Sequence, residues 1–283
     1  MIRAGWERLQ RVPLVRLVRE VASRSGRENG GQMAAALTYY AFLSIFPLLL
    51  LALSVAGFAL SGDEAAQQRW LERLTSAIPG LGDLIERNLR AVVEGRTAGG
   101  ILAVLGLLWS GMGIVGAART SLARIWRRPM AQNPFLLRLR TLAALAALGL
   151  VAIASAAGTG FLAGLGGREG SALALRVLGI VAAAAVDTGS FLLAYRLLTP
   201  GPGPAFAVLL PGAALMAVGW TGLKLAGTWY VARVVARATA IYGSFAAVIG
   251  ILAILNVAAQ LFVYGAVLSA VLAERRGERV DAP

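Results

Sequence analysis

Residues 33–60 of the 283-residue chain read MAAALTYYAFLSIFPLLLLALSVAGFAL. No charged residue occurs between Glu28 and Asp63, so the uncharged run covers residues 29–62. A bilayer core about 30 Å thick is crossed by roughly 20 helical residues. The stretch is therefore long enough to span a membrane with some tilt, and it predicts an integral membrane protein.

Three residues of this stretch distinguish it from a uniformly apolar span. Tyr40, Ser44 and Pro47 lie at i, i+4 and i+7, which places them on one stripe of a helix. Pro47 cannot donate a backbone hydrogen bond and its ring crowds the carbonyl of Leu43, so a kink is expected there. Because a freed carbonyl in lipid needs a partner within the protein, the stripe is expected to face other helices.

The rest of the composition extends this interpretation to an all-α polytopic membrane protein. The chain is 58% hydrophobic and only 14% charged, a balance that soluble domains rarely show. Six spans are predicted, although five or seven remain possible because residues 160–180 can be read as one hairpin. The predicted spans are 33–60, 98–118, 141–166, 171–199, 205–231 and 241–273, within a membrane domain of residues 29–273 followed by a cytoplasmic tail, 274–283.

The arginines indicate the orientation of the chain. The segment before the first span holds seven, and the loop between the second and third spans holds six and no acid. Arg275, Arg276 and Arg279 follow the last span. Since these regions fall on one side of a six-span chain, the positive-inside rule predicts cytoplasmic termini in a bacterial inner membrane. Anionic lipid headgroups are the partner expected for this face, and nucleic acid is disfavoured despite the net charge of +13.

Two segments outside the spans carry helical periodicity. Residues 1–28 predict an amphipathic cytoplasmic helix on the inner membrane surface, with its arginines toward lipid headgroups. The loop 61–97 predicts two short helices around Pro79-Gly80, resting on the outer face or acting as a substrate lid. In the third span, Gly160 and Gly164 form a GxxxG motif, which favours close helix packing within the chain or in a homo-oligomer.

Polar residues within the spans are the candidate site. Asp187 lies near the middle of the fourth span, where a carboxylate costs about 2.5–3.5 kcal/mol on insertion scales. Three interpretations stay open: Asp187 lines a functional cavity, it makes a structural hydrogen bond to another helix, or the bounds of the fourth span are misplaced. Asn256, Gln260 and Tyr264 form a second stripe at i, i+4 and i+8. The residues predicted to line a mid-membrane cavity are Tyr39, Tyr40, Ser44, Pro47, Asp187, Asn256, Gln260 and Tyr264.

The residue types that are missing exclude several chemistries. The chain has no cysteine and no histidine, so thiolate metal sites, disulfides and a histidine general base are excluded. No GxxxxGK[ST] nucleotide-binding motif occurs. We therefore expect no cofactor, no metal site and no enzymatic activity.

Several short motifs resemble the YihY/BrkB family of bacterial inner-membrane proteins, some of which carry the older label ribonuclease BN. The resemblance covers roughly residues 25–275. It rests on Ala35-Ala36, Tyr39-Tyr40, Ser44, Pro47, Trp109-Ser110, Ile125-Trp126, Tyr195-Arg196, Pro200, Pro211-Gly212-Ala213, Tyr242-Gly243-Ser244 and Gly265-Ala266. Val267 stands where family members usually have a glutamate, and Ile254 and Asn256 stand where they usually have aromatic residues.

The resemblance implies six spans with cytoplasmic termini, and links to virulence, to envelope properties and to movement of lipids or envelope precursors. Two functions follow as hypotheses. The first is a transporter or a protein that handles lipids or envelope precursors through a mid-membrane polar cavity. The second is a non-catalytic scaffold or assembly partner in the cell envelope. The ribonuclease function is disfavoured, because metal-dependent RNA cleavage requires a cluster of carboxylates or histidines.

Overall fold

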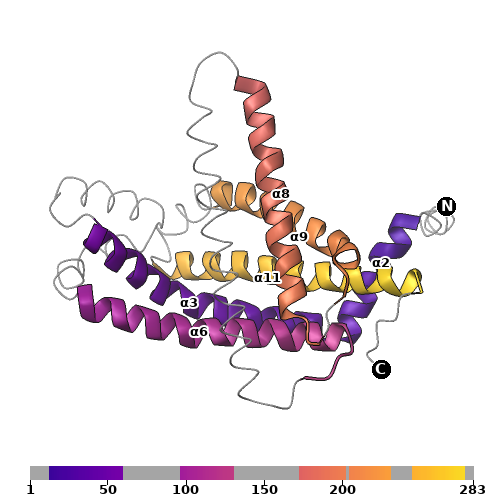
Figure 1. Ribbon diagram of the computed structural model, residues 1–283, viewed down its shortest axis with the longest axis horizontal. Coiled ribbons are helices and arrows are strands. Elements are labelled where there is room, and N and C mark those ends of the chain that lie inside the picture. Colours follow the sequence, from indigo (N-terminus) through magenta and orange to yellow (C-terminus); the bar gives the residue numbers. More distant parts are fainter. Residues whose placement is uncertain (1–12, 60–95, 131–171, 202–203, 231–243, 278–283) are drawn as a thin grey trace. The chain divides into compact units, whose positions relative to one another are not determined.

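The computed structural model describes residues 13–59, 96–130, 172–201, 204–230 and 244–277. All regular secondary structure in these residues is helical (Figure 1). The helices are α2 (Pro13–Arg27), α3 (Gly30–Ala59), α6 (Arg96–Ile125), α8 (Ala172–Leu198), α9 (Phe206–Tyr230) and α11 (Ser244–Arg275). The predicted all-α class is therefore confirmed for this part of the chain.

Helices α3, α6, α8, α9 and α11 overlap five of the six predicted spans. The remaining span, 141–166, and residues 61–95 of the predicted outer loop lie outside the described residues. Within the described residues, two segments are long and apolar enough to cross a bilayer, Phe206–Lys224 and Val248–Arg275. The expectation that the chain crosses the membrane six times therefore stays a prediction.

The chain divides into two compact units. The first unit comprises Met1–Ala35, Val115–Thr221 and Ala258–Pro283. It contains α2, α8 and the adjoining parts of the other helices. The second unit comprises Ala36–Ile114 and Gly222–Val257.

A tight turn joins α2 to α3 in the first unit. Asn29 adopts a left-handed conformation with φ 59°, and its carbonyl accepts from the amides of Gln32 and Met33 in the first turn of α3 at 2.9 and 3.2 Å. A Cβ atom on Gly30 would collide with the Ser25 hydroxyl. Asparagine tolerates the left-handed region better than other non-glycine residues, so Asn29 and Gly30 together permit the change of direction.

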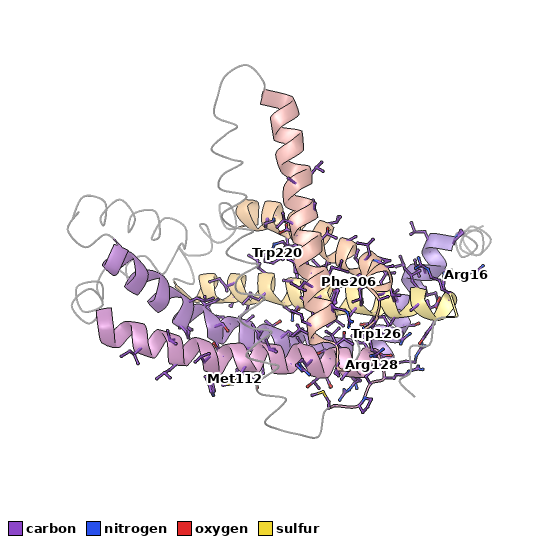
Figure 2. All side chains as sticks on the ribbon, viewed as in Figure 1. Arg16, Met112, Trp126, Arg128, Phe206 and Trp220 are labelled. Carbon is purple, nitrogen blue, oxygen red and sulfur yellow. The ribbon has the colours of Figure 1, made fainter. Side chains whose placement is uncertain are left out.

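The end of α6 is closed by a Schellman motif. The Arg128 amide donates to the Ala123 carbonyl at 2.8 Å and the Arg127 amide donates to the Arg124 carbonyl at 3.2 Å. This pattern places Arg127 at the position where glycine is usual, and its φ is 48°. The motif fixes Trp126 and Arg128 at the end of the helix (Figure 2).

The first unit has a well-packed core drawn from α6, α8, α9 and α11. Its largest fully buried side chains belong to Trp126, Tyr195, Leu122, Ile125, Leu209, Val115, Val263, Val267 and Val271. Phe191 and Trp220 add an edge-to-face ring contact between α8 and α9, with centroids 6.4 Å apart. Packing of these side chains positions the polar groups described below.

Candidate functional site

The predicted stripe of α3 faces α6 within the second unit. A Cβ atom on Gly113 would collide with the Tyr40 ring, and one on Gly106 would lie 2.9 Å from Cγ of Pro47. The two glycines thus leave room for the two bulky residues, and the order of the contacts makes the helices antiparallel. Ser110, one turn from Gly106 and 1% exposed, completes the small-residue face of α6.

Ser44 lies between Tyr40 and Pro47 and is also buried. Its hydroxyl donates to the carbonyl of Tyr40 in the preceding turn at 2.8 Å, a local bond that often bends a helix. Tyr39 points elsewhere, since it is 57% exposed. In the second unit, therefore, Tyr40, Ser44 and Pro47 share a helix-packing face and Tyr39 does not.

Asn256 also belongs to the second unit. Its side-chain amide donates to the Thr38 hydroxyl at 3.3 Å, which links the first half of α11 to α3. In largely apolar surroundings, a hydrogen bond of this kind between two helices stabilises their association. The structure thus brings Asn256 to α3, the helix that carries four of the other predicted site residues.

The remaining candidates belong to the first unit. Asp187 is half-buried near the middle of α8. Its neighbours Thr188 and Ser190 both donate to carbonyls of their own helix, those of Ala184 and Val186, at 2.7 Å. On α11, Gln260 is exposed and Tyr264 is 37% exposed. A cavity lined by all eight predicted residues would draw on both units and stays a prediction.

A close helix crossing within the first unit joins α9 to α11. A Cβ atom on Gly212 would collide with the Gly265 carbonyl, and one on Gly265 would lie 2.7 Å from the Gly212 carbonyl. The amide of Gly212 donates to the Ser269 hydroxyl at 3.1 Å, and Ser269 Oγ lies 3.2 Å from the Leu209 carbonyl. Ser269 thus bonds the backbone of α9 on both sides of Pro211, a residue that has no backbone donor of its own.

Tyr195 of α8 joins the same crossing. Its hydroxyl donates to the Phe262 carbonyl of α11 at 2.8 Å, and its ring lies 4.8 Å from the Phe262 ring. A Cβ atom on Gly265 would also collide with the Tyr195 hydroxyl. Tyr195, Gly212, Gly265 and Ser269 form what we call the crossing cluster, which fixes three helices to one another in the first unit.

A buried arginine ties three elements together at another place in the first unit. Arg24 of α2 is 4% exposed. Its guanidinium donates to Glu28 at 3.0 Å, to Glu274 of α11 at 2.6 Å and to the Ile125 carbonyl at the end of α6 at 3.0 Å. A cation at a helix C-terminus interacts favourably with the helix dipole. Arg24 is thus an exception to the expectation that the arginines of residues 1–28 face lipid headgroups, because its guanidinium is buried and bonded within the protein. For the other arginines of this segment the expectation stays a prediction.

Two further contacts extend this ionic cluster. Glu20 of α2 is paired with Arg275 at the end of α11, with Arg275 Nε 3.1 Å from Glu20 Oε2. Arg128 donates to the carbonyl of Pro200, in the turn that follows α8, at 3.3 Å. Figure 2 labels Arg128 and the fully buried Trp126 at the end of α6. Arg128 thus connects the end of α6 to the α8–α9 turn.

Sequence reasoning did not identify the crossing cluster or Arg24 as important residues. Tyr195, Gly212 and Gly265 lie within the motifs that carry the family resemblance, and that was their only signal. Ser269 lies in none of these motifs. Val267, at the position where the family usually has a glutamate, is fully buried.

Comparison with known proteins decides the family. The family model described as virulence factor BrkB matches residues 21–283. The chain belongs to the BrkB family. An uncharacterised protein of Dickeya dadantii (strain 3937) is 27% identical over 243 residues, which cover 79% of this chain and 74% of that protein.

The inner membrane protein YhjD of Escherichia coli (strain K12) is also similar to this BrkB-family chain. The two are 28% identical over 136 residues, covering 46% of this chain and 40% of YhjD. No solved structure matches the chain. Together with the long apolar helices, the family match and the similarity to YhjD identify the chain as a membrane protein.

Proposed function

We propose that this BrkB-family protein moves or handles an amphiphilic molecule, a lipid or an envelope precursor, across or within the inner membrane. In this proposal the chain acts without a cofactor and without catalysing a covalent reaction. The substrate enters a polar region at mid-membrane depth, where its headgroup meets the side chains of Asp187, Gln260 and Tyr264. Both termini are cytoplasmic, as the arginine distribution predicts.

The observation that carries the proposal is the exposure of a polar side chain, that of Gln260, at a mid-helix position of the first unit. Gln260 lies in the middle of α11, within a segment apolar enough to cross the bilayer, and yet its side chain is exposed on the unit. Polar residues at such depth generally face a bundle interior or a water-filled cavity. An exposed amide there is suited to a headgroup or to water, and unsuited to acyl chains.

Asp187 adds a titratable group at a similar position in α8. Keeping a carboxylate in the middle of a span costs about 2.5–3.5 kcal/mol on insertion scales. A group retained at that cost is a functional candidate by default. Its half-buried state leaves part of the side chain accessible to a ligand that approaches the unit.

The test is transbilayer movement of fluorescent phospholipids in vesicles that contain the purified protein. We expect the protein to accelerate movement, and Asp187→Asn and Gln260→Leu to abolish most of the acceleration. Thr188→Val is the matched control, because the Thr188 hydroxyl is satisfied by its own helix. If the unchanged protein gives no acceleration, or if Asp187→Asn moves lipid as fast as Thr188→Val, lipid transport through Asp187 is wrong.

A scaffold in the cell envelope is the second candidate, and the exposed basic side chains of the first unit favour it. Arg27, Arg124 and Arg276 are exposed, and they could dock an acidic partner protein. If the protein is a scaffold, expression of the Asp187→Asn variant in cells that lack the protein should restore envelope integrity. Expression of the double variant Arg124→Glu/Arg276→Glu should not. The opposite pattern supports the first proposal.

A further inference from the structure

Helix α2 changes its surroundings halfway along its length. Its buried residues, Val21, Arg24 and Ser25, all lie in the C-terminal half. In the N-terminal half, Leu14 is 67% exposed and Val18 is 61% exposed. The second half therefore packs on the first unit, and the first half extends beyond that packing contact.

The exposed half nevertheless keeps an apolar stripe. Leu14, Val18, Val21 and Ser25 follow at intervals of four, three and four residues, which places them on one face of the helix. The face that is buried at Val21 and Ser25 is thus continuous with a face that is uncovered at Leu14 and Val18. Val15, 37% exposed, widens this uncovered stripe.

The charges next to the stripe are basic. Arg19 lies beside Val15 at the edge of the stripe, and Arg16 lies farther around the helix. Both are exposed, and Arg16 is labelled in Figure 2. Glu20, the single acidic residue in the sequence of α2, is paired with Arg275. The uncovered half of α2 therefore presents an apolar stripe flanked by positive charge that no acid of the same helix neutralises, a pattern typical of helices that lie on anionic membranes.

The position of α2 in the chain brings it close to a membrane surface. Only Glu28 and Asn29 separate α2 from α3, and α3 lies within the uncharged run of residues 29–62. The end of α2 is held to the ends of α6 and α11 by Arg24. Because α2 is fixed at the start of α3 and at the end of α11, two long apolar helices, it lies near the level of the lipid headgroups if those helices cross the membrane.

We propose that the N-terminal half of α2, residues 13–19, is a docking surface for anionic lipid, with Leu14, Val15 and Val18 inserted among the upper acyl chains and Arg16 and Arg19 at the headgroups. Arg24 and Glu20 hold the second half of the helix on the protein. This surface is separate from the mid-membrane residues of the proposed function and operates whether or not the protein moves lipid.

The chain contains no cysteine, so single-cysteine variants of the full-length protein report on chosen positions. A spin label at Val18→Cys probes the stripe, and one at Ser23→Cys probes the exposed polar face. The labelled proteins are placed one copy at a time in nanodiscs of phosphatidylcholine with phosphatidylglycerol. Accessibility to oxygen, which concentrates in the bilayer, is compared with accessibility to a water-soluble nickel chelate.

We expect the Val18 label to be exposed to oxygen and shielded from nickel, and the Ser23 label to show the reverse. Replacing Arg16 and Arg19 by glutamine should lower the ratio of membrane-inserted to free label about fivefold for each arginine. The reason is that each basic residue near an anionic membrane surface contributes an attraction of that size. Nanodiscs without phosphatidylglycerol should show the same loss in the unchanged protein.

Three results would overturn the proposal. Equal nickel accessibility at Val18 and Ser23 would place the stripe in water. Shielding of Val18 from both reagents would mean that protein covers it, for example residues 1–12 of the same chain. Insertion that is identical with and without phosphatidylglycerol would remove the anionic lipid as the partner.

Discussion

At the scale of single residues, the first unit depends on a few side chains with unusual surroundings. Asn29 holds a left-handed backbone between α2 and α3. Arg24 is a buried cation shared among Glu28, Glu274 and the end of α6. Each makes a contribution to stability that a substitution can isolate.

Asn29→Ala should destabilise the protein by about 1 kcal/mol, because an L-residue with a Cβ and no compensating side chain is strained in the left-handed region. Asn29→Gly removes that strain and should change stability by less than about 0.5 kcal/mol. The fraction of protein that stays monodisperse in detergent after heating measures both. Equal losses for alanine and glycine would show that the asparagine side chain matters for another reason than backbone conformation.

Arg24→Met should cost about 3 kcal/mol, the lower end of the range for removing one partner of a buried ion pair. The lower end is expected because the side chain of Glu274 is 38% exposed and can be hydrated. Arg19→Met, at an exposed position of the same helix, is the control and should change thermal stability little. A loss no larger than that of the control would mean that Arg24 does not hold α2 in place.

At the scale of elements, the crossing of α9 and α11 requires glycine on both helices. Gly212→Ala would press a methyl group into the Gly265 carbonyl, and overpacking of this kind typically costs about 1–3 kcal/mol. Gly222→Ala in the same helix meets nothing within 4 Å, so it should stabilise the helix by up to about 1 kcal/mol. Opposite shifts in thermal stability are expected, and a stabilising Gly212→Ala would contradict the close crossing.

Ser269→Ala tests the hydrogen bonds of the same crossing. The substitution removes the acceptor of the Gly212 amide and a polar partner of the Leu209 carbonyl. A loss of about 1 kcal/mol is expected, the usual size for a hydrogen bond. Ser190→Ala, whose hydroxyl bonds only its own helix, should be nearly neutral in the same heating assay. Equal effects of the two serine substitutions would show that Ser269 does not join the helices.

At the scale of the whole molecule, the all-α architecture could be predicted from the sequence, because long uncharged runs leave a membrane chain few alternatives to helices. The inner-facing stripe of α3 was also predictable, since Tyr40, Ser44 and Pro47 share a face by helical period alone. Arg24 and Ser269 were not predictable. Their partners lie 250 and 57 residues away in the sequence, and no local pattern encodes such pairings.

The proposed mid-membrane cavity is tested most directly by a structure of the protein in lipid nanodiscs. The account predicts an enclosed or membrane-open cavity beside Asp187, with elongated lipid-like density against Gln260 and Tyr264. A closed, dry interior in which a neighbouring helix alone satisfies Asp187, with acyl chains packed against Gln260, would contradict it and favour the scaffold.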